Sequence, residues 1–184
     1  MAKVSSEIMN IRIATNQDRD YIQRVHLCAF PEGEGEIVSE LAMDLLSEKT
    51  TPQIISLVAE TDGFIVGHIA FSPVIIESNK NIQGYILAPL GVIPDYQKRC
   101  IGSKLIEYGM QQLSVTGVNV VFVYGDPKYY GRFGFSADSS HQYIPPYNLQ
   151  YPFGWQAIVI NECDNEKEPV AITCVTSLCK QILW

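Results

Sequence analysis

The sequence predicts a single mixed α/β domain across all 184 residues, built on a largely antiparallel sheet. Three observations support this fold class. Apolar runs of strand length recur along the chain, and segments with apolar residues at helical spacing lie between them. An Asp-Gly pair at positions 62 and 63 joins two of the apolar runs, which is typical of an antiparallel hairpin.

Each element is predicted from its own hydrophobic period and from the turn residues that bound it. In chain order, we expect a strand over 11–15, a helix that ends at Phe30-Pro31, a helix over 37–47, strands over 54–60, 64–71 and 83–93, a helix from Ile101, a strand over 118–124, a short helix, and strands over 155–161 and 170–177. The last two strands predict an extra carboxyl-terminal hairpin. A proline-rich, aromatic loop over 136–153 precedes them.

Composition indicates a globular protein of the cytosol. Hydrophobic residues make up 47% of the chain and charged residues 18%, but no apolar run is long enough to cross a bilayer. The first seven residues lack the apolar core of a secretion signal. Five cysteines, an odd number without metal-ligand spacing, indicate reduced thiols and no metal site.

The formal net charge of -7 argues against a nucleic-acid partner, because binding a phosphate backbone needs a basic surface. It is compatible with an amine-bearing partner drawn to an acidic face, or with solubility alone. The sequence also predicts no membrane partner. It leaves the oligomeric state open, with a homodimer as one alternative.

The stretch over 86–106 is the most informative part of the chain. It predicts a buried strand, a turn at Pro94-Asp95 and the start of an amphipathic helix at Ile101. Two cations and several small residues lie at the helix start, where unpaired N–H groups and the helix dipole attract phosphate. We therefore expect a pyrophosphate-binding site here, with an ordinary capped helix as the alternative.

The run LGVIPDYQKRCIGSKLI resembles the acetyl-coenzyme A (acetyl-CoA) signature of the GNAT N-acetyltransferase superfamily. Gln97 and Gly102 match that signature, whereas Cys100 stands where the family usually has its first glycine. The order of predicted elements is also that of the GNAT fold, in which the central strands splay apart. The resemblance covers a core over 11–150 and leaves 151–184 as an added carboxyl-terminal extension.

The resemblance implies acetyl-CoA as co-substrate and a set of residues that bind it. These residues are Leu90, Gly91, Val92, Gln97, Lys98, Arg99, Cys100, Ile101, Gly102 and Ser103. A backbone N–H near Leu90 or Gly91 is implied to polarise the acetyl carbonyl, and residues 90–92 to pair with the pantetheine arm as an added strand would. Close approach of another backbone is the usual reason for a glycine such as Gly91.

The stretch GDPKYYGRFGF resembles the segment after the fifth strand of GNAT enzymes, in the shortened form of the YhbS-type subgroup. Tyr130 has the family's spacing to Gly134-Phe135, which implies that it is the general acid for the departing thiolate. A phenol is a proton donor at neutral pH, so the chemistry is consistent. The alternative is a tyrosine that packs in an aromatic cluster.

The general base is not fixed by the sequence. The candidates are Glu32, Glu34 and Glu36 in an acidic loop, His68 on a hairpin strand, His141 in the aromatic loop, or a chain of waters. Cys100 has three alternatives of its own. Its thiolate is stabilised at the helix start, its side chain displaces the pyrophosphate, or it is a small residue that the site tolerates.

These features predict an acetyl-CoA-dependent N-acetyltransferase in which the amine of a small molecule, peptide or protein attacks the thioester directly. A non-catalytic acyl-CoA sensor with the same fold is the alternative. An unrelated nucleotide-binding α/β protein is disfavoured, because no glycine-rich phosphate loop follows the first strand.

Overall fold

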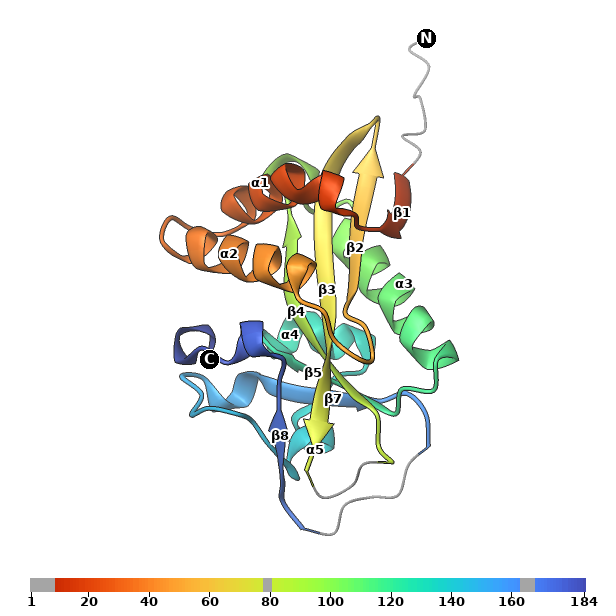
Figure 1. Ribbon diagram of the computed structural model, residues 1–184, viewed down its shortest axis with the longest axis vertical. Helices are drawn as coiled ribbons and strands as arrows, with labels where there is room; N and C mark the ends of the chain where they lie inside the picture. The colour runs from red at the N-terminus through yellow and green to blue at the C-terminus, as the bar shows by residue number, and fades with distance from the viewer. Residues whose placement is uncertain (1–8, 78–80, 163–167) are drawn as a thin grey trace.

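A computed structural model describes residues 9–77, 81–162 and 168–184 and confirms the mixed α/β fold class (Figure 1). The strands are β1 (Met9–Ile13), β2 (Ile55–Thr61), β3 (Phe64–Ile76), β4 (Gly84–Val92), β5 (Val120–Tyr124), β6 (Tyr143–Ile144), β7 (Trp155–Val159) and β8 (Val170–Thr173). The helices are α1 (Arg19–Ala29), α2 (Glu34–Ser47), α3 (Ile101–Val115), α4 (Pro127–Tyr130) and α5 (Ala137–Ser140). Short 3-10 turns are η1 (Asn16–Asp18), η2 (Pro94–Tyr96), η3 (Gly131–Phe133), η4 (Pro152–Gly154), η5 (Thr176–Leu178) and η6 (Gln181–Leu183).

The main sheet runs in the order β1-β2-β3-β4-β5-β7. Its neighbours are antiparallel except for β4 and β5, which are parallel over Gly84↔Val120 to Leu87↔Val123. A parallel pair needs a crossover, and α3 supplies it. The sheet is therefore mixed, with its one parallel pair beside the stretch that the sequence analysis singles out.

The predicted carboxyl-terminal hairpin is wrong. β7 pairs with β5 at the edge of the main sheet, whereas β8 pairs with the far end of β3 and with β6. The predicted strand over 64–71 ends too early, and residues 143–144 lie in the predicted loop over 136–153. β3 in fact continues to Ile76, so β8 has a partner there.

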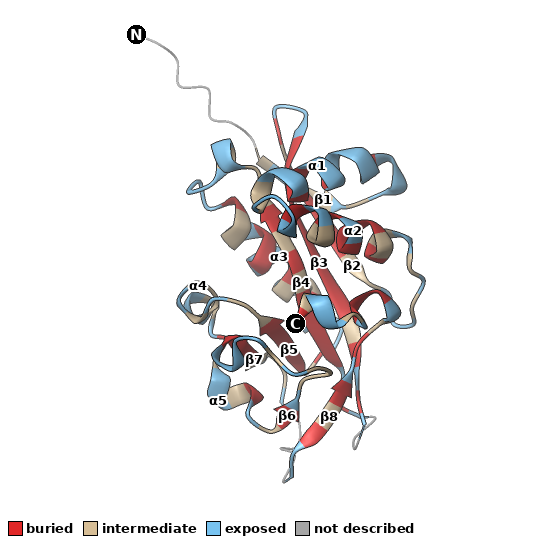
Figure 2. Cartoon of the chain, turned by 90° about the vertical axis from the view of Figure 1, so that its left-hand side faces the viewer, coloured by how far each residue is buried: buried red, intermediate tan, exposed pale blue. Residues whose placement is uncertain are grey.

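Helices cover both faces of the sheet. The side of β4 at Gly91 faces α1, where an added Cβ would lie 2.8 Å from His26 Nδ1. The side of β3 at Gly67 faces α3, where an added Cβ would lie 3.1 Å from Ile101 Cγ2. Figure 2 shows the result, with buried central strands and exposed outer faces of the helices.

Helix α2 begins one turn earlier than the predicted residue 37. Gly33 adopts φ +88°, a conformation that favours glycine, and its N–H donates to the Glu36 carboxylate at 2.6 Å. This cap allows the acidic residues of the predicted loop to enter the first turn of the helix. Glu34 and Glu36 are therefore held on a helix and not in a flexible loop.

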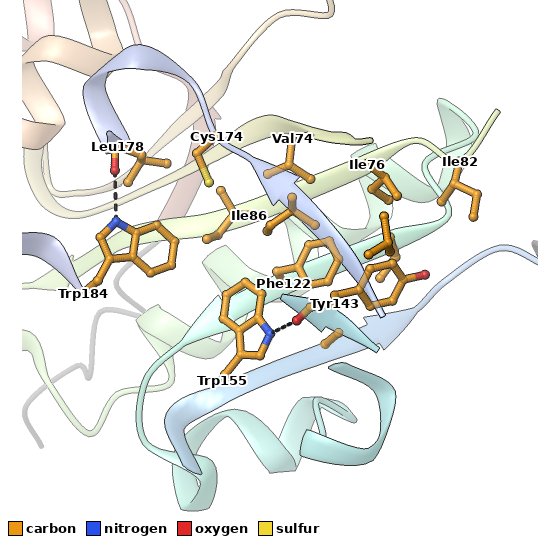
Figure 3. Packing of buried hydrophobic residues seen from close by; sticks show 14 of the residues in the cluster. Val74, Ile76, Ile82, Ile86, Phe122, Tyr143, Trp155, Cys174, Leu178 and Trp184 are labelled. Carbon is orange, nitrogen blue, oxygen red and sulfur yellow. Dashed lines mark hydrogen bonds between the residues drawn. The ribbon is translucent and has the colours of Figure 1, made fainter. Parts of the chain in front are cut away.

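One core cluster combines aliphatic side chains with the aromatic rings of Phe122, Tyr143, Trp155 and Trp184 (Figure 3). Phe122 of β5 stacks on Trp155 of β7 with ring centroids 5.3 Å apart. The indole N–H of Trp155 donates to Tyr143 O at 2.9 Å, and that of Trp184 donates to Leu178 O at 3.0 Å. Both buried indoles thus have hydrogen-bond partners.

Several predictions concern residues that the structure does not describe. Residues 1–7, the middle of the predicted loop over 77–81, and Cys163 lie outside the described ranges. The other four cysteines, Cys28, Cys100, Cys174 and Cys179, are free thiols. Within residues 9–77, 81–162 and 168–184, no helix combines the length and the hydropathy needed to cross a bilayer.

Candidate active site

Strands β4 and β5 separate after Leu87 and Val123, where their pairing stops. β4 continues for five further residues, whereas β5 ends at Tyr124. A bulge marks the same point on the other side of β4, because Ala88 and Pro89 lie opposite the single residue Ala70 of β3. Bulges redirect a strand and occur next to active sites.

The separation leaves backbone groups of β4 without a neighbouring strand. Ile93 N–H donates to Val66 O at 2.9 Å, so it points towards β3. Because N–H groups alternate in direction along a strand, those of Leu90 and Val92 point to the opposite side, where β5 is absent. The Val92 carbonyl on that side accepts from Gln97 Nε2 at 3.0 Å.

A first cavity, the interstrand cavity, occupies the gap between the separated strands and has a volume of about 970 Å³. Residues 86–90 line one wall, and residues 124–127 with Tyr130 line the other. The rest of the lining comes from Phe30 just after α1, from α2, and from parts of the segments 150–154 and 178–184. Its volume lies in the range of small-molecule sites.

A second cavity, the helix-start cavity, has a volume of about 730 Å³ and lies at the beginning of α3. Of the predicted residues, Gln97, Lys98, Cys100, Ile101, Gly102 and Ser103 line it together with Leu90 and Val92. The first backbone bond of α3 runs from Lys104 N–H to Cys100 O, so the three preceding N–H groups lie before the helical bonding pattern begins. Leu90 and Asp126 line both cavities, which therefore meet at these residues.

The far wall of the helix-start cavity was missed by the sequence analysis. Lys128, Tyr129 and Arg132 line it, so two further cations join Lys98 around the helix start. The signal that could have found them is topological: the carboxyl ends of parallel strands meet at one edge, so the segment after β5 must face the segment after β4. Arg132 also lies over the ring of Tyr129, with Cζ 4.5 Å from the ring centroid.

Tyr129 reaches directly onto the helix start. A Cβ on Gly102 would lie 2.6 Å from Tyr129 Oη, and the Ser103 side chain hydrogen bonds to the same hydroxyl. Burial raises the pKa of Tyr129, although the Arg132 charge and the Ser103 hydrogen bond act in the opposite direction. An alanine at position 102 would therefore force the Tyr129 side chain to shift.

Two of the predicted binding residues line neither cavity. Arg99 places its guanidinium 5.2 Å from the centroid of the Tyr96 ring. Gly91 is a glycine because α1 packs against it, since a Cβ there would meet His26. The predicted close approach at Gly91 is therefore made by helix α1, through the side chain of His26.

Cys100 occupies a left-handed conformation, with φ 61° and ψ 13°, at the residue before α3. This explains why the family usually has glycine at the position, because a residue with a Cβ pays a conformational cost there. The side chain is exposed and lines the helix-start cavity. Cys100 thus combines backbone strain with a position where phosphate would bind.

The position of Tyr130 is compatible with both predicted roles, a general acid at the site and a tyrosine that packs in an aromatic cluster. Its ring packs edge-on against Phe135 and Tyr129, with centroids 6.0 and 5.1 Å away, and it also lines the interstrand cavity. Gly125 makes room for it, since a Cβ there would lie 2.5 Å from Tyr130 Cε2. Burial, and then the charges of Tyr129 and Asp126, raise the pKa of Tyr130, so the phenol keeps its proton at neutral pH.

Of the five candidate side chains for the general base, only Glu34 lines the interstrand cavity. The Glu36 carboxylate caps α2, and Glu32 lines neither cavity. His141 is exposed, with Nδ1 2.6 Å from Asp138 O. His68 is buried on β3 and is engaged in a hydrogen-bonded chain.

The hydrogen-bonded chain of side chains links β2 and β3 to helix α1, which packs against β4. Ser56 Oγ lies 2.8 Å from His68 Nε2, and His68 Nδ1 lies 2.8 Å from His26 Nε2. Burial lowers the pKa of His26 to about 4 and that of His68 well below its ordinary value, so both rings are neutral. Within the described residues, His26 Nδ1 has no hydrogen-bond partner and rests against Gly91.

A metal site is not evident in the part of the chain that the structure describes, where no group of three or more His, Cys, Asp or Glu residues is arranged to hold an ion.

A parallel strand pair that opens at its carboxyl ends, next to a helix start with cations around it, is an arrangement that α/β proteins use to bind phosphate-bearing ligands. The comparisons with known proteins agree with this class. A family model described as an acetyltransferase (GNAT) domain matches residues 10–137. The chain belongs to the GNAT acetyltransferase family.

Two relatives come from Escherichia coli K12, the uncharacterized N-acetyltransferases YjhQ and YhbS. YjhQ is 36% identical over 113 residues, which are 60% of this chain and 62% of YjhQ. YhbS is 35% identical over 88 residues, which are 47% of this chain and 52% of YhbS. The chain thus matches less than two thirds of the length of either relative.

Two solved structures share the fold over most of their length. YhbS from Escherichia coli, in complex with CoA, has a TM-score of 0.75 at 25% identity and covers 88% of this chain and 86% of its own. A GNAT family acetyltransferase from Brucella melitensis, in complex with acetyl-CoA, has a TM-score of 0.70 at 34% identity and covers 90% and 96%. One of these structures contains CoA, and the other contains acetyl-CoA.

Proposed function

We propose that the protein is an N-acetyltransferase that transfers the acetyl group of acetyl-CoA to a primary amine by direct attack. The observation that carries the proposal is that the two cavities meet at Leu90. One cavity offers backbone N–H groups and cations for phosphate, and the other offers space for an acceptor. A single ligand can therefore have its phosphates in one cavity and its acyl group in the other.

In this proposal, the helix start binds the pyrophosphate of acetyl-CoA. The N–H groups of Ile101, Gly102 and Ser103 donate to it, and the positive end of the α3 dipole adds to the attraction. Lys98, Lys128 and Arg132 provide the countercharge. The pantetheine arm pairs with the N–H of Val92, in place of the missing strand.

The acetyl carbonyl is placed beside the N–H of Leu90, which stabilises negative charge on its oxygen. The amine nitrogen attacks the carbonyl carbon, the bond from carbon to sulfur breaks, and Tyr130 donates its proton to the departing thiolate. The proton lost by the amine passes to solvent, and solvent returns a proton to Tyr130. Holding the two reactants together is expected to provide most of the acceleration.

The test combines binding and turnover. Calorimetry measures whether CoA and acetyl-CoA bind with one site per chain, and release of free thiol in the presence of amines measures transfer. Binding with amine-dependent thiol release supports the proposal. Binding without turnover, and no loss of rate in Tyr130→Phe, would support an acyl-CoA sensor in its place.

A further inference from the structure

The interstrand cavity also has lining residues outside β4 and β5, which are named the acceptor wall. This wall includes Phe30 just after α1, Ile37 and Val38 of α2, and Tyr151, Phe153, Ile182 and Leu183. These segments are far apart in sequence, so the wall exists only in the folded chain. What the wall can bind follows from its charges and its polarity.

The charges in the interstrand cavity are of one sign. Its lining includes the carboxylates Glu34 and Asp126 and contains no lysine, arginine or histidine. Asp126 already accepts the Lys128 N–H at 2.9 Å as the cap of α4, whereas Glu34 lies at the first turn of α2. An acceptor with its own carboxylate or phosphate would find no countercharge here, but an ammonium group would.

The acceptor wall is apolar and open to solvent. Tyr151, Phe153 and Ile182 are 53%, 66% and 70% exposed, and all three line this one cavity. Large apolar side chains gathered at the mouth of a cavity mark a ligand-binding surface. A polyhydroxylated acceptor would leave its hydroxyl groups unpaired against such a wall.

The carboxyl-terminal segment 176–184, which contributes Ile182 to the wall, is held against α2 and the residue that follows it. Lys180 Nζ lies 3.1 Å from Glu40 Oε1 and 3.0 Å from Asp44 Oδ2, and the N–H groups of Thr176 and Ser177 donate to Glu48 at 2.9 and 3.0 Å. The indole of Trp184 closes the turn by donating to Leu178 O (Figure 3). The segment 176–184 is therefore anchored, so the apolar surface is present before any ligand binds.

We propose that the acceptor is a small primary amine with an apolar or aromatic body and no charge besides its ammonium group. Glu34 binds the ammonium group, and Phe153 and Ile182 cover the body. This inference rests on the proposed function for the reaction, but it specifies the acceptor independently. Amino acids are disfavoured because their carboxylate finds no countercharge, amino sugars because their hydroxyl groups find no partners, and polyamines because their further ammonium groups would lie against the apolar wall.

The test is an acceptor panel in which 2-phenylethylamine, tryptamine and hexylamine are compared with spermidine, glucosamine and glutamate. We expect kcat/KM for the apolar amines to be higher by about a hundredfold, measured by thiol release at saturating acetyl-CoA. A polyamine, amino sugar or amino acid as the best acceptor would overturn the inference.

Two variants test the binding groups. Glu34→Gln is expected to raise KM for 2-phenylethylamine about tenfold, because the ammonium group loses its countercharge, while the affinity for CoA stays unchanged. Phe153→Ser is expected to raise the same KM about tenfold, because part of the apolar wall is lost. Glu32→Gln, two residues away and outside both cavities, is the matched control. An unchanged KM in Glu34→Gln and Phe153→Ser would contradict the inference.

A binding measurement separates this inference from the proposed reaction. If no amine supports turnover, 2-phenylethylamine is titrated into the complex with CoA. If 2-phenylethylamine binds and Glu34→Gln weakens that binding, the proposed acceptor class is supported even though the proposed acetyl transfer has failed. No binding of any apolar amine would overturn the acceptor class itself.

Discussion

The hydroxyl of Tyr129 lies against Gly102, so close that a Cβ on Gly102 would come within 2.6 Å of it. The two residues come from segments 27 positions apart and meet only because β4 and β5 are parallel neighbours. This contact joins the helix start to the segment that carries Tyr130. It therefore connects the site expected to bind phosphate with the site expected to donate a proton.

The contact makes Gly102→Ala costly. The added methyl group must displace a packed tyrosine, and we expect a loss of about 1–3 kcal/mol in the free energy of unfolding. Tyr129→Phe removes the oxygen that clashes and should restore part of the loss in the double variant. Denaturant titrations of the four proteins give the coupling, and additive effects would contradict the contact.

Cys100→Gly is expected to stabilise the protein by about 0.5–1 kcal/mol, because glycine removes the left-handed strain at φ 61° and gives back part of the gain as chain entropy. It should also tighten acetyl-CoA binding if the side chain displaces the pyrophosphate. Cys100→Ala keeps the Cβ and serves as the control, with no gain in stability. An unchanged or higher dissociation constant for acetyl-CoA in Cys100→Gly would refute the displacement hypothesis.

Acid is expected to destabilise the fold through His26 and His68. Both pKa values are lowered by burial, that of His26 to about 4, so below pH ~6.5 the unfolded chain binds protons that the folded chain does not. Stability is therefore full above pH ~6.5 and falls as the pH drops towards the folded pKa values, by about 1.4 kcal/mol per pH unit for each histidine.

Chemical denaturation between pH 7 and pH 4.5 measures this slope. His26→Gln should reduce the slope by about one proton whatever its effect on absolute stability, because glutamine does not titrate. His141→Gln changes an exposed ring and should leave the slope as it is. A His26→Gln slope equal to the wild-type slope would show that the ring is not held neutral.

Tyr130→Phe should lower kcat about a hundredfold with little effect on CoA binding, because it removes the proposed proton donor and keeps the packed ring. Tyr129→Phe is the matched control, since that residue lines the helix-start cavity and not the interstrand cavity. Steady-state thiol release under saturating acetyl-CoA gives kcat for both. Equal rates in wild type and Tyr130→Phe would leave Tyr130 with a packing role only.

Local sequence patterns were enough for most of the fold. The Asp-Gly turn at 62–63 predicts the β2-β3 hairpin, and the change of period at Ile101 predicts α3. The carboxyl-terminal strands were misassigned because sequence proximity favours a hairpin, whereas the partners of β7 and β8 are β5 and β3. Such long-range pairing leaves no local signal.

The site was predictable on one side only. The helix start has a motif, so Gln97 and Gly102 could be located from their spacing. Lys128, Tyr129 and Arg132 face it from another segment, and only the parallel register brings them there. The strained φ of Cys100 and the packing of His26 on Gly91 are likewise properties of the backbone in three dimensions.

The central claim is that the start of α3 binds the phosphates of CoA, and Ser103→Asp tests it most directly. An acidic residue in the first turn is compatible with the helix dipole, so the melting temperature should be kept or raised. Its charge should repel the pyrophosphate, and calorimetric titration of CoA should show binding weaker by about a hundredfold or more than the one-to-one binding of wild type. Wild-type affinity for CoA in folded Ser103→Asp would contradict the claim.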